Sequence, residues 1–441
     1  MTTNTATLDA LRVTMIEKVQ KMGWAKRPEV ERVLRDTSRH EFVPEAPLEK
    51  AYDPYNAVIT HRFSDGSSLS CASAPFVVAM MLDQLQVSPG SRVLEIGAGT
   101  GYNASLLAEL TGPTGRLTTI DIDPDVTAQA SHALHAAGYD DVRVVTGDGA
   151  AGVPENAPYD RLIATVSPWD IPNAWWDQLA PGARVVAPLR WRGQARSVAF
   201  TYTDGRLVAD SIELCGFVYL VGEGEGETSA PITNDQTITV HWDRDQAVNP
   251  DALRGVFDQP RVTAWSGVTI AGDEPHDGVW LRLTVTDRRV CRINAPGGTP
   301  PEVCDPVEAC RAPALVDGDS MAYLASRRRE TDDGARWELG AYGHGPAATK
   351  LTERLCNEVR AWSVERDQRK PNLTVYRAGT PDTDLSGTII DKTNSRFVLN
   401  YDIIGCLPSD ELIGEAVKRK HEVGIVAEDA SIENPSNDQE L

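Results

Sequence analysis

A glutamate followed by three closely spaced glycines is the part of this 441-residue sequence best suited to chemistry. Glu95 precedes Gly97, Gly99 and Gly101 in the run R-V-L-E-I-G-A-G-T-G-Y-N-A, which starts at Arg92. Glycine adopts positive φ and lets a ligand contact the backbone, and a helix that begins there offers unpaired N–H groups. A strand, a tight glycine turn and a helix N-terminus together predict a cradle of nucleotide size.

The glycine spacing indicates which ligand this cradle binds. It reads G-x-G-x-G, whereas a pyrophosphate on the helix requires G-x-G-x-x-G, so a Rossmann dehydrogenase is disfavoured. Glu95 would repel a diphosphate and attract a cation. The combination favours S-adenosylmethionine. For the glycines alone, an ordinary strand-to-helix turn would be the better interpretation.

Two further side chains have positions that suggest a role. Asp121 ends an expected strand over 117–120, about 20 residues after the glycines, where a ribose-binding acid is expected. Ser73 precedes Pro75 at the start of an expected helix, where a serine commonly caps the first turn. On local sequence alone, the capping role is the better account of Ser73.

Alternating strands and helices around these residues predict the fold. Apolar runs predict strands over 93–96, 117–120, 142–145, 160–166 and 179–188. With helices between them, they specify an α/β, Rossmann-like, doubly wound parallel sheet. We expect helices over 8–22 and from Pro28 to precede the sheet, and a hairpin over 197–203 and 207–214, turning at Asp204-Gly205, to close its edge.

Changes in composition divide the chain into four parts. We expect a methyltransferase-sized domain over 1–221, a linker of glycine and acid over 222–231, a C-terminal α+β domain over 232–426, and a disordered acidic tail over 427–441. The C-terminal domain is expected to be mixed or antiparallel. The expected strands are 237–242, 279–286, 337–341, 373–376 and 396–401, with helices starting at 249–250 and running over 346–364. His344, in Y-G-H-G-P, is best explained by a glycine-rich turn.

Charge and cysteine content exclude several classes of protein. A net charge of −21 argues against broad nucleic-acid binding, which requires neutralising phosphates. No apolar run approaches the ~20 residues of a membrane span, and no signal-peptide pattern opens the chain, so we expect a cytoplasmic protein with no membrane partner. Its oligomeric state stays open, with a monomer favoured. The seven cysteines are widely spaced without a C-x-x-C pair. Reduced thiols are expected, and Cys304 with Cys310 makes only a weak case for a metal.

Several motifs in conserved order resemble one known family. Ser73-Ala74-Pro75, V-L-E-I-G-A-G-T-G-Y-N-A, G-Y-D-D-V-R-V-V-T-G-D-G, A-P-Y-D-R-L-I-A-T-V-S and L-A-P-G-A-R-V-V-A-P-L, together with H-E-F-V-P, resemble the protein-L-isoaspartate O-methyltransferases over about residues 8–189. The resemblance implies that Glu95, Gly97, Gly99 and Gly101 hold the cofactor, that Asp121 binds its ribose and Asp148-Gly149 its adenine, and that Ser73 is the active-site serine. Family members usually read Thr-Ile-Ser where this chain has Cys71-Ala72-Ser73.

The C-terminal half resembles extended members of the family encoded beside ribosomal peptide natural products. The similar stretches are C-G-F-V at Cys215, W-E-L-G-A-Y-G-H-G-P and R-A-G-T-P-D. The resemblance implies methylation of an aspartate in a lanthipeptide, lasso peptide or graspetide, a modified and macrocyclic substrate, followed by closure of the ester to an aspartimide.

Two other functions remain open at this point. One is repair of isoaspartyl damage in many proteins. The other is a peptide-binding module whose methyltransferase half is vestigial, and the intact Glu95, Asp121 and Asp148 argue against it.

Overall fold

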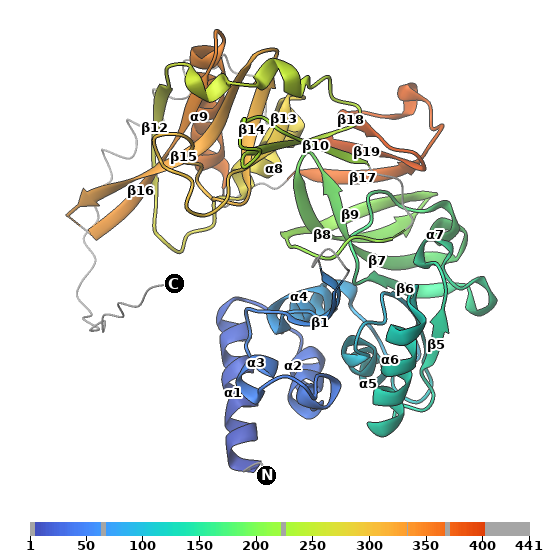
Figure 1. Cartoon of the computed structure of the whole chain (residues 1–441). Coiled ribbons are helices and arrows are strands. Elements are labelled where there is room, and N and C mark those ends of the chain that lie inside the picture. Colours follow the sequence, from blue (N-terminus) through green and yellow to red (C-terminus); the bar gives the residue numbers. More distant parts are fainter. Residues whose placement is uncertain (1–4, 63–67, 222–225, 333, 367–370, 402–441) are drawn as a thin grey trace, which may run out of the picture. The chain divides into compact units, whose positions relative to one another are not determined.

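The computed structural model describes residues 5–62, 68–221, 226–332, 334–366 and 371–401 (Figure 1). These residues form a ten-stranded sheet, a seven-stranded sheet and a two-stranded hairpin. No helix among them is long and apolar enough to cross a membrane. The acidic tail expected over 427–441 lies outside the described residues, and so does Cys406.

One half of the ten-stranded sheet, which ends at β5, is the parallel sheet expected from the sequence. Its five parallel strands lie in the order β5-β4-β3-β6-β7. They are β3 (Arg92–Ile96), β4 (Arg116–Asp121), β5 (Arg143–Thr146), β6 (Tyr159–Ala164) and β7 (Leu179–Trp191). Successive residues of β3 enter different cores, since Val93 packs into one cluster and Leu94 into another. Burial on both faces explains why the middle strand β3 is mostly apolar.

Helices cover the sheet on both faces, which confirms the doubly wound architecture. The helices of this half are α4 (Pro75–Leu85), α5 (Tyr102–Thr111), α6 (Pro124–Ala136) and the short α7 (Asn173–Asp177). The core cluster containing Val93 also contains the buried residues of α4 and α5, and the one containing Leu94 contains Trp175 and Trp176 of α7. Asp123 caps α6 by accepting hydrogen bonds from the backbone N–H groups of Asp125 and Val126.

The N-terminal segment forms the two expected helices and a hairpin that the sequence did not indicate. The expected helices are α1 (Thr5–Lys21) and α2 (Pro28–Asp36), and a short third helix, α3 (Leu48–Ala51), follows them. The buried face of α2 consists of Val30, Val33 and Leu34, as its spacing predicts. The hairpin pairs β1 (Val58–Arg62) with β2 (Ser68–Ala72), and β2 leads directly to Ser73.

The hairpin of β8 (Gln194–Thr203) and β9 (Arg206–Leu214) forms as expected, with positive φ at Asp204 and Gly205. The prediction that it closes the sheet edge is wrong, because β17 (Asn372–Arg377) pairs with β9. Strands β19 (Ser395–Asn400) and β18 (Thr388–Asp391) then extend the same sheet. The stretch 232–426 therefore does not form one separate sheet, since its last described strands join the sheet of the first half.

The second sheet is antiparallel and has the order β10-β11-β13-β14-β15-β16-β12. Its strands are β10 (Glu227–Pro231), β11 (Thr239–Asp243), β12 (Val262–Ile270), β13 (Val290–Asn294), β14 (Ala312–Asp317), β15 (Ser320–Thr331) and β16 (Gly334–His344). Helix α9 (Ala348–Glu365) packs on β12, β15 and β16 through Leu351, Leu355, Val359 and Trp362, the face expected from the sequence. The half is α+β, as predicted.

Three local predictions in this half are wrong. The segment expected as a strand over 279–286 is helix α8 (Gly278–Thr286), because its large apolar residues are buried against α9 and β7 and the tertiary packing outweighs its β-branched composition. The expected linker is partly strand, since β10 begins at Glu227. The helix expected from Asn249 is only a 3-10 turn.

The 3-10 turns of the described residues are Arg39–Phe42, Gly149–Ala151, Pro154–Asn156, Pro250–Leu253, Val256–Asp258 and Asp382–Asp384.

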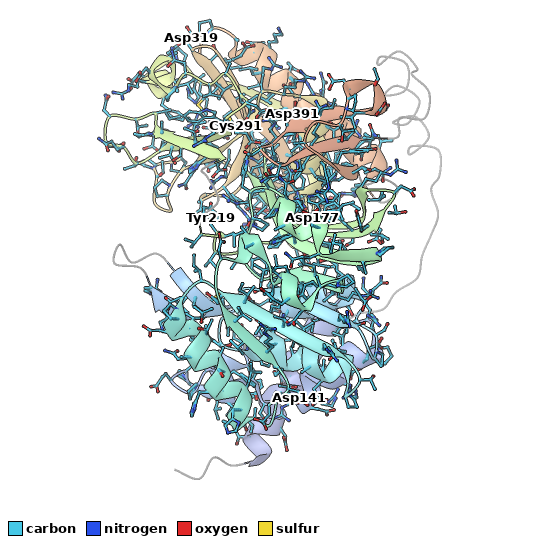
Figure 2. The ribbon with its side chains drawn as sticks, turned by 90° about the vertical axis from the view of Figure 1, so that its right-hand side faces the viewer. Asp141, Asp177, Tyr219, Cys291, Asp319 and Asp391 are labelled. Carbon is cyan, nitrogen blue, oxygen red and sulfur yellow. The ribbon has the colours of Figure 1, made fainter. Side chains whose placement is uncertain are left out.

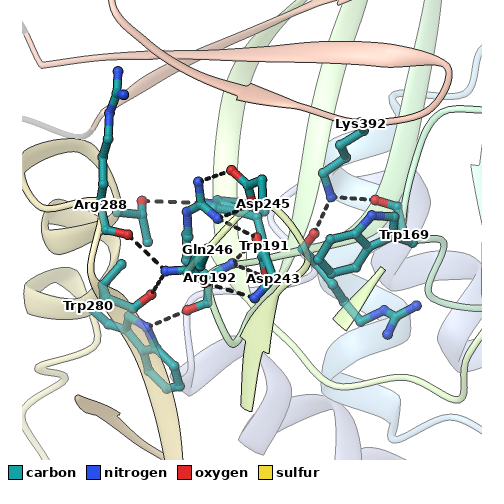
Figure 3. Close-up of polar contacts among 12 residues, drawn as sticks. Trp169, Trp191, Arg192, Asp243, Asp245, Gln246, Trp280, Arg288 and Lys392 are labelled. Carbon is teal, nitrogen blue, oxygen red and sulfur yellow. Dashed lines mark hydrogen bonds and ion pairs between the residues drawn. The ribbon is translucent and has the colours of Figure 1, made fainter. Parts of the chain in front are cut away.

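Polar contacts join the end of β7 to the second sheet (Figure 3). The buried Arg192 binds Asp243, the last residue of β11, and Asp245, two residues further on. Its Nη2 lies 2.7 Å from Asp245 Oδ2. Its carbonyl accepts a hydrogen bond from Trp280 Nε1 of α8 at 3.1 Å. Lys392, between β18 and β19, donates to the carbonyls of Trp169 and Arg190. These bonds fix the second half on the strands that carry the site.

Candidate active site

A cavity of about 1210 Å³ opens at the carboxyl ends of the parallel strands, where α/β sheets bind their ligands. A smaller cavity of about 50 Å³ adjoins it beside the glycine turn. Both are lined by Ser73, Gly97 and Asp121, so the structure brings these three predicted residues together.

The glycines of the turn have two different roles. Gly97 has a φ of 102°, and a Cβ there would lie 2.6 Å from Thr165 Oγ1. Gly99 has a φ of 51° and donates its N–H to Asp121 Oδ2 at 3.2 Å. Both line the smaller cavity. Gly101 does not line it; a Cβ at this position would lie 3.1 Å from Leu134 Cγ, so the residue allows α5 to pack against α6.

Glu95 lies behind the cavity wall and is fully buried. Its Oε1 accepts a hydrogen bond from Asn103 Nδ2 at 2.7 Å, and its Oε2 has no hydrogen-bond partner. Burial raises the pKa of Glu95 to about 7. Asn103 itself lines the smaller cavity, and the sequence did not single it out. Its position in the first turn of α5 was the available signal. Glu95 thus faces the ligand space through Asn103.

Asp121 and the Asp148-Gly149 pair lie at the ends of neighbouring strands. Asp121 is half-buried, lines both cavities, and accepts backbone N–H groups from Gly99 and from Asp123. Gly149 is buried and lines the larger cavity; a Cβ there would lie 2.5 Å from Ile96 Cγ2. The exposed carboxylate of Asp148 accepts from Ala150 N at 2.9 Å and lines neither cavity. Of this pair, only Gly149 faces the ligand space.

Ser73 does not cap the following helix. The N-cap of α4 is Ala74, and no side chain makes a capping hydrogen bond there. The capping interpretation of Ser73 is therefore wrong, because the helix begins one residue later than that role requires. Ser73 is half-buried and lines both cavities beside Cys71. Its hydroxyl contacts the Cys71 side chain through a hydrogen bond at the cavity wall.

A buried arginine holds the backbone that carries Ser73. Arg39 is 0% exposed. It donates from Nη2 to the Ser73 carbonyl at 2.7 Å and to the Ala72 carbonyl at 3.1 Å, and from Nε to the Ala51 carbonyl at 2.7 Å. Its guanidinium stacks on Tyr102, 4.7 Å from the ring centroid. The sequence did not single out Arg39, although it directly precedes the H-E-F-V-P motif.

The larger cavity also receives residues from the second half. Its lining includes Pro275, Asp277 and Arg311 of the second half, beside the first-half segment 213–221, which comprises the end of β9 and the residues after it. Asp277 forms an ion pair with the buried Arg196 of β8. No group of metal-ligating side chains is found in the part of the chain that the structure describes, and Cys304 and Cys310 are free thiols.

Comparison with known proteins assigns the first half of the chain. The family model described as protein-L-isoaspartate(D-aspartate) O-methyltransferase matches residues 11–225. A protein-L-isoaspartate O-methyltransferase of Hyperthermus butylicus is 37% identical over 221 residues, which cover 48% of this chain and 89% of that protein. The chain belongs to the protein-L-isoaspartate O-methyltransferase family. It is thus a carboxyl O-methyltransferase that depends on S-adenosylmethionine, as its sequence indicated.

Two solved structures match parts of this chain with low sequence identity. One described as a protein-L-isoaspartate O-methyltransferase covers 89% of this methyltransferase and 100% of its own chain, with 20% identity and a TM-score of 0.46. A Plasmodium falciparum protein of the same description, solved with S-adenosyl-L-homocysteine, covers 48% of this chain and 98% of its own, with 17% identity and a TM-score of 0.42.

The residues around the smaller cavity fit the cofactor. The positive-φ glycines leave room where a Cβ would collide, and the Asp121 carboxylate retains lone pairs to accept ribose hydroxyls. Burial behind Asn103 favours the neutral form of Glu95, whose Oε2 is unpaired, and a bound sulfonium cation would favour its ionised form. Gly97, Gly99, Asn103, Asp121 and Gly149 are the residues that would hold the cofactor.

Replacing Asp121 with alanine is expected to weaken S-adenosylmethionine binding by about 1–3 kcal/mol, because a hydrogen bond from the ribose to a carboxylate is lost. Isothermal titration calorimetry measures this change. Asp148→Ala is the matched control, because its carboxylate caps an exposed turn outside both cavities. Wild-type affinity in Asp121→Ala, or an equal loss in both variants, would reject this role for Asp121.

Glu95 is expected to make the stability of the ligand-free enzyme fall as pH rises from about 4.5 to 7. Its pKa is 4.5 when unfolded and about 7 when folded, so in this window the folded state binds more protons than the unfolded state. Glu95→Gln should therefore be more stable than wild type above pH 7, by up to about 3 kcal/mol, and similar below pH 4.5. Urea unfolding at pH 5 and pH 8 tests this; a difference that is the same at both pH values contradicts it.

Proposed function

We propose that this methyltransferase esterifies an aspartate side chain in a ribosomally synthesised, constrained peptide. The methyl ester then closes to an aspartimide, which gives isoaspartate on hydrolysis. Both the modified, macrocyclic nature of the peptide and the role of the second half in selecting it belong to the proposal.

The observation that carries the proposal is the lining of the larger cavity. The family match ends at residue 225, and yet Pro275, Asp277 and Arg311 line the cavity together with Ser73. An enzyme that repairs many proteins benefits from an open, shallow site that accepts any flexible isoaspartyl segment. A cavity with walls from both halves favours a compact substrate, and a pre-organised peptide loses little entropy when it binds there.

The chemistry requires few protein groups. S-adenosylmethionine supplies an electrophilic methyl group. An aspartate carboxylate is already ionised at neutral pH, so no strong general base is needed. Ser73 donates a hydrogen bond that orients this carboxylate, and Arg39 fixes the Ser73 backbone. Alignment of the reacting atoms can contribute about 7–11 kcal/mol.

Ring closure follows from the ester itself. The backbone nitrogen after the aspartate attacks the ester carbonyl, a C–N bond forms, and methanol leaves with the amide proton. The product is a five-membered imide, and this step requires no group of the enzyme.

The test compares three substrates with the full-length enzyme: an aspartyl peptide closed into a ring, its linear form, and a generic isoaspartyl peptide. Mass spectrometry distinguishes the ester, at about +14 Da, from the imide, at about −18 Da. We expect strong preference for the cyclised peptide. Equal activity on the generic isoaspartyl peptide would reject the proposal and support repair of damaged proteins. The full chain is required, because β9 pairs with β17 and a fragment ending at residue 221 would lose that strand.

A further inference from the structure

Large apolar side chains that are exposed to solvent gather around one opening. Nine such side chains occur among the described residues, and six of them line the larger cavity. The six, which we call the apolar rim, are Met22, Tyr55, Ile59, Ile122, Tyr219 and Val221. Tyr219, labelled in Figure 2, is 56% exposed. Scattered single apolar residues are ordinary on a surface, but a cluster at a cavity marks a binding site.

The rim comes from four distant stretches of chain, which the fold brings to the same cavity. Met22 follows α1 and Ile122 follows β4. Tyr55 lies just before β1, and Ile59 lies within it. Tyr219 and Val221 lie after β9, where Tyr219 is held against Arg190, whose guanidinium carbon is 3.8 Å from the ring centroid. A rim assembled in this way is continuous with the space that holds Ser73 and Asp121.

Among the described residues that line this cavity, Arg311 is the one lysine or arginine. The other charged lining residues are the carboxylates of Asp121, Glu213 and Asp277. Arg311 Nε donates to Glu308 at 3.4 Å, and the two side chains are 40% and 45% exposed, so this ion pair contributes little and can be exchanged. Asp277 is bound by Arg196 instead. The charge of Arg311 is thus open to a ligand.

We propose that the apolar rim and Arg311 together select the peptide: the rim binds apolar side chains next to the methylated residue, and Arg311 binds a second carboxylate of the same peptide. This inference rests on the proposed action on a peptide. An arginine fork binds a carboxylate in two parallel hydrogen bonds. In a chain with a net charge of −21, a local cation also offsets the repulsion of an acidic peptide.

Equilibrium binding of dye-labelled peptides, followed by fluorescence anisotropy with S-adenosylhomocysteine present, tests the inference. The probes are twin peptides with leucines beside the reactive residue and, further along, either glutamate or glutamine. One pair is linear and isoaspartyl, and the other is aspartyl and closed by a lactam. In at least one pair, the wild-type enzyme should bind the glutamate peptide about tenfold more tightly than the matching glutamine peptide.

Two variants and their controls assign the effect. Arg311→Ala should bind both twins equally, while Arg254→Ala, an exposed arginine paired with Asp251 outside the cavity, should keep the preference. Ile59→Ser should weaken the binding of both the glutamate and the glutamine peptide to a similar extent. Val364 is exposed outside the cavity, so Val364→Ser should weaken the binding of neither peptide.

The outcomes are separate from those of the proposed function. Preference for the lactam over the linear pair bears on the constrained substrate, whereas preference for glutamate over glutamine bears on Arg311. Equal binding of the twins by wild type, a preference that persists in Arg311→Ala, or no binding of any probe would overturn the inference.

Discussion

Replacing Arg39 with methionine is expected to lower the free energy of unfolding by about 3 kcal/mol or more, since it leaves the buried carbonyls of Ala51, Ala72 and Ser73 without their donor. Methionine matches only the aliphatic part of the side chain, so the loss combines the missing hydrogen bonds with the lost guanidinium contact on Tyr102. Urea unfolding, followed by tryptophan fluorescence, measures the change.

The matched control is Arg35→Met. Arg35 is 45% exposed and pairs with Glu31 one helical turn earlier, an interaction that contributes about 0.3–0.5 kcal/mol. Arg39→Lys separates charge from geometry, because an ammonium group keeps the charge and cannot reproduce the planar fork that reaches three carbonyls. If Arg39→Met unfolds at the same urea concentration as Arg35→Met, then Arg39 does not hold the Ser73 backbone.

The first half of the fold could be predicted because its signals are local. The strand with Val93, Leu94 and Ile96 is mostly apolar apart from Glu95, since both faces of the sheet are covered, and the glycines mark the turn that follows. The second half offered weaker signals. Antiparallel pairing depends on residues far apart in the sequence, and helix α8 has the β-branched, aromatic composition of a strand.

The pairing of β17 with β9 illustrates a limit of reasoning from sequence order. Nothing in the hairpin at Asp204-Gly205 indicates that a strand 160 or more residues later covers its edge, because the partners Val375 and Leu207 meet only through the tertiary fold. An exposed edge strand invites association, and a later segment of the same chain is one way to cover it.

The sequence predicted the residues that line the cavities at the ends of strands and in the glycine turn. It did not predict positions that depend on the surrounding tertiary structure. Gly97, Gly99, Asp121 and Ser73 line the cavities as expected. Glu95 was expected at the ligand, but its place inside β3 buries it behind Asn103. Arg311 was not predicted, because its place in the cavity depends on how the second sheet meets β8 and β9.

Ser73→Ala is expected to reduce kcat/KM for methyl transfer about 10- to 100-fold, with little change in the melting temperature. A hydrogen bond to a charged carboxylate contributes about 1.5–3 kcal/mol, and each 1.4 kcal/mol corresponds to a factor of ten. Because α4 is capped at Ala74 without a side-chain bond, loss of the hydroxyl removes no helix cap.

Steady-state methylation with radiolabelled S-adenosylmethionine, together with calorimetric binding of the cofactor, tests this role. Cofactor affinity should stay near wild type, because we propose that the hydroxyl contacts the substrate carboxylate and that the glycine turn and Asp121 hold the cofactor. Ser73→Thr keeps a hydroxyl and should recover part of the rate, which a purely structural role would not explain. A melting temperature that falls in Ser73→Ala while turnover per folded enzyme is unchanged would show that the serine supports the fold and does not orient the carboxylate.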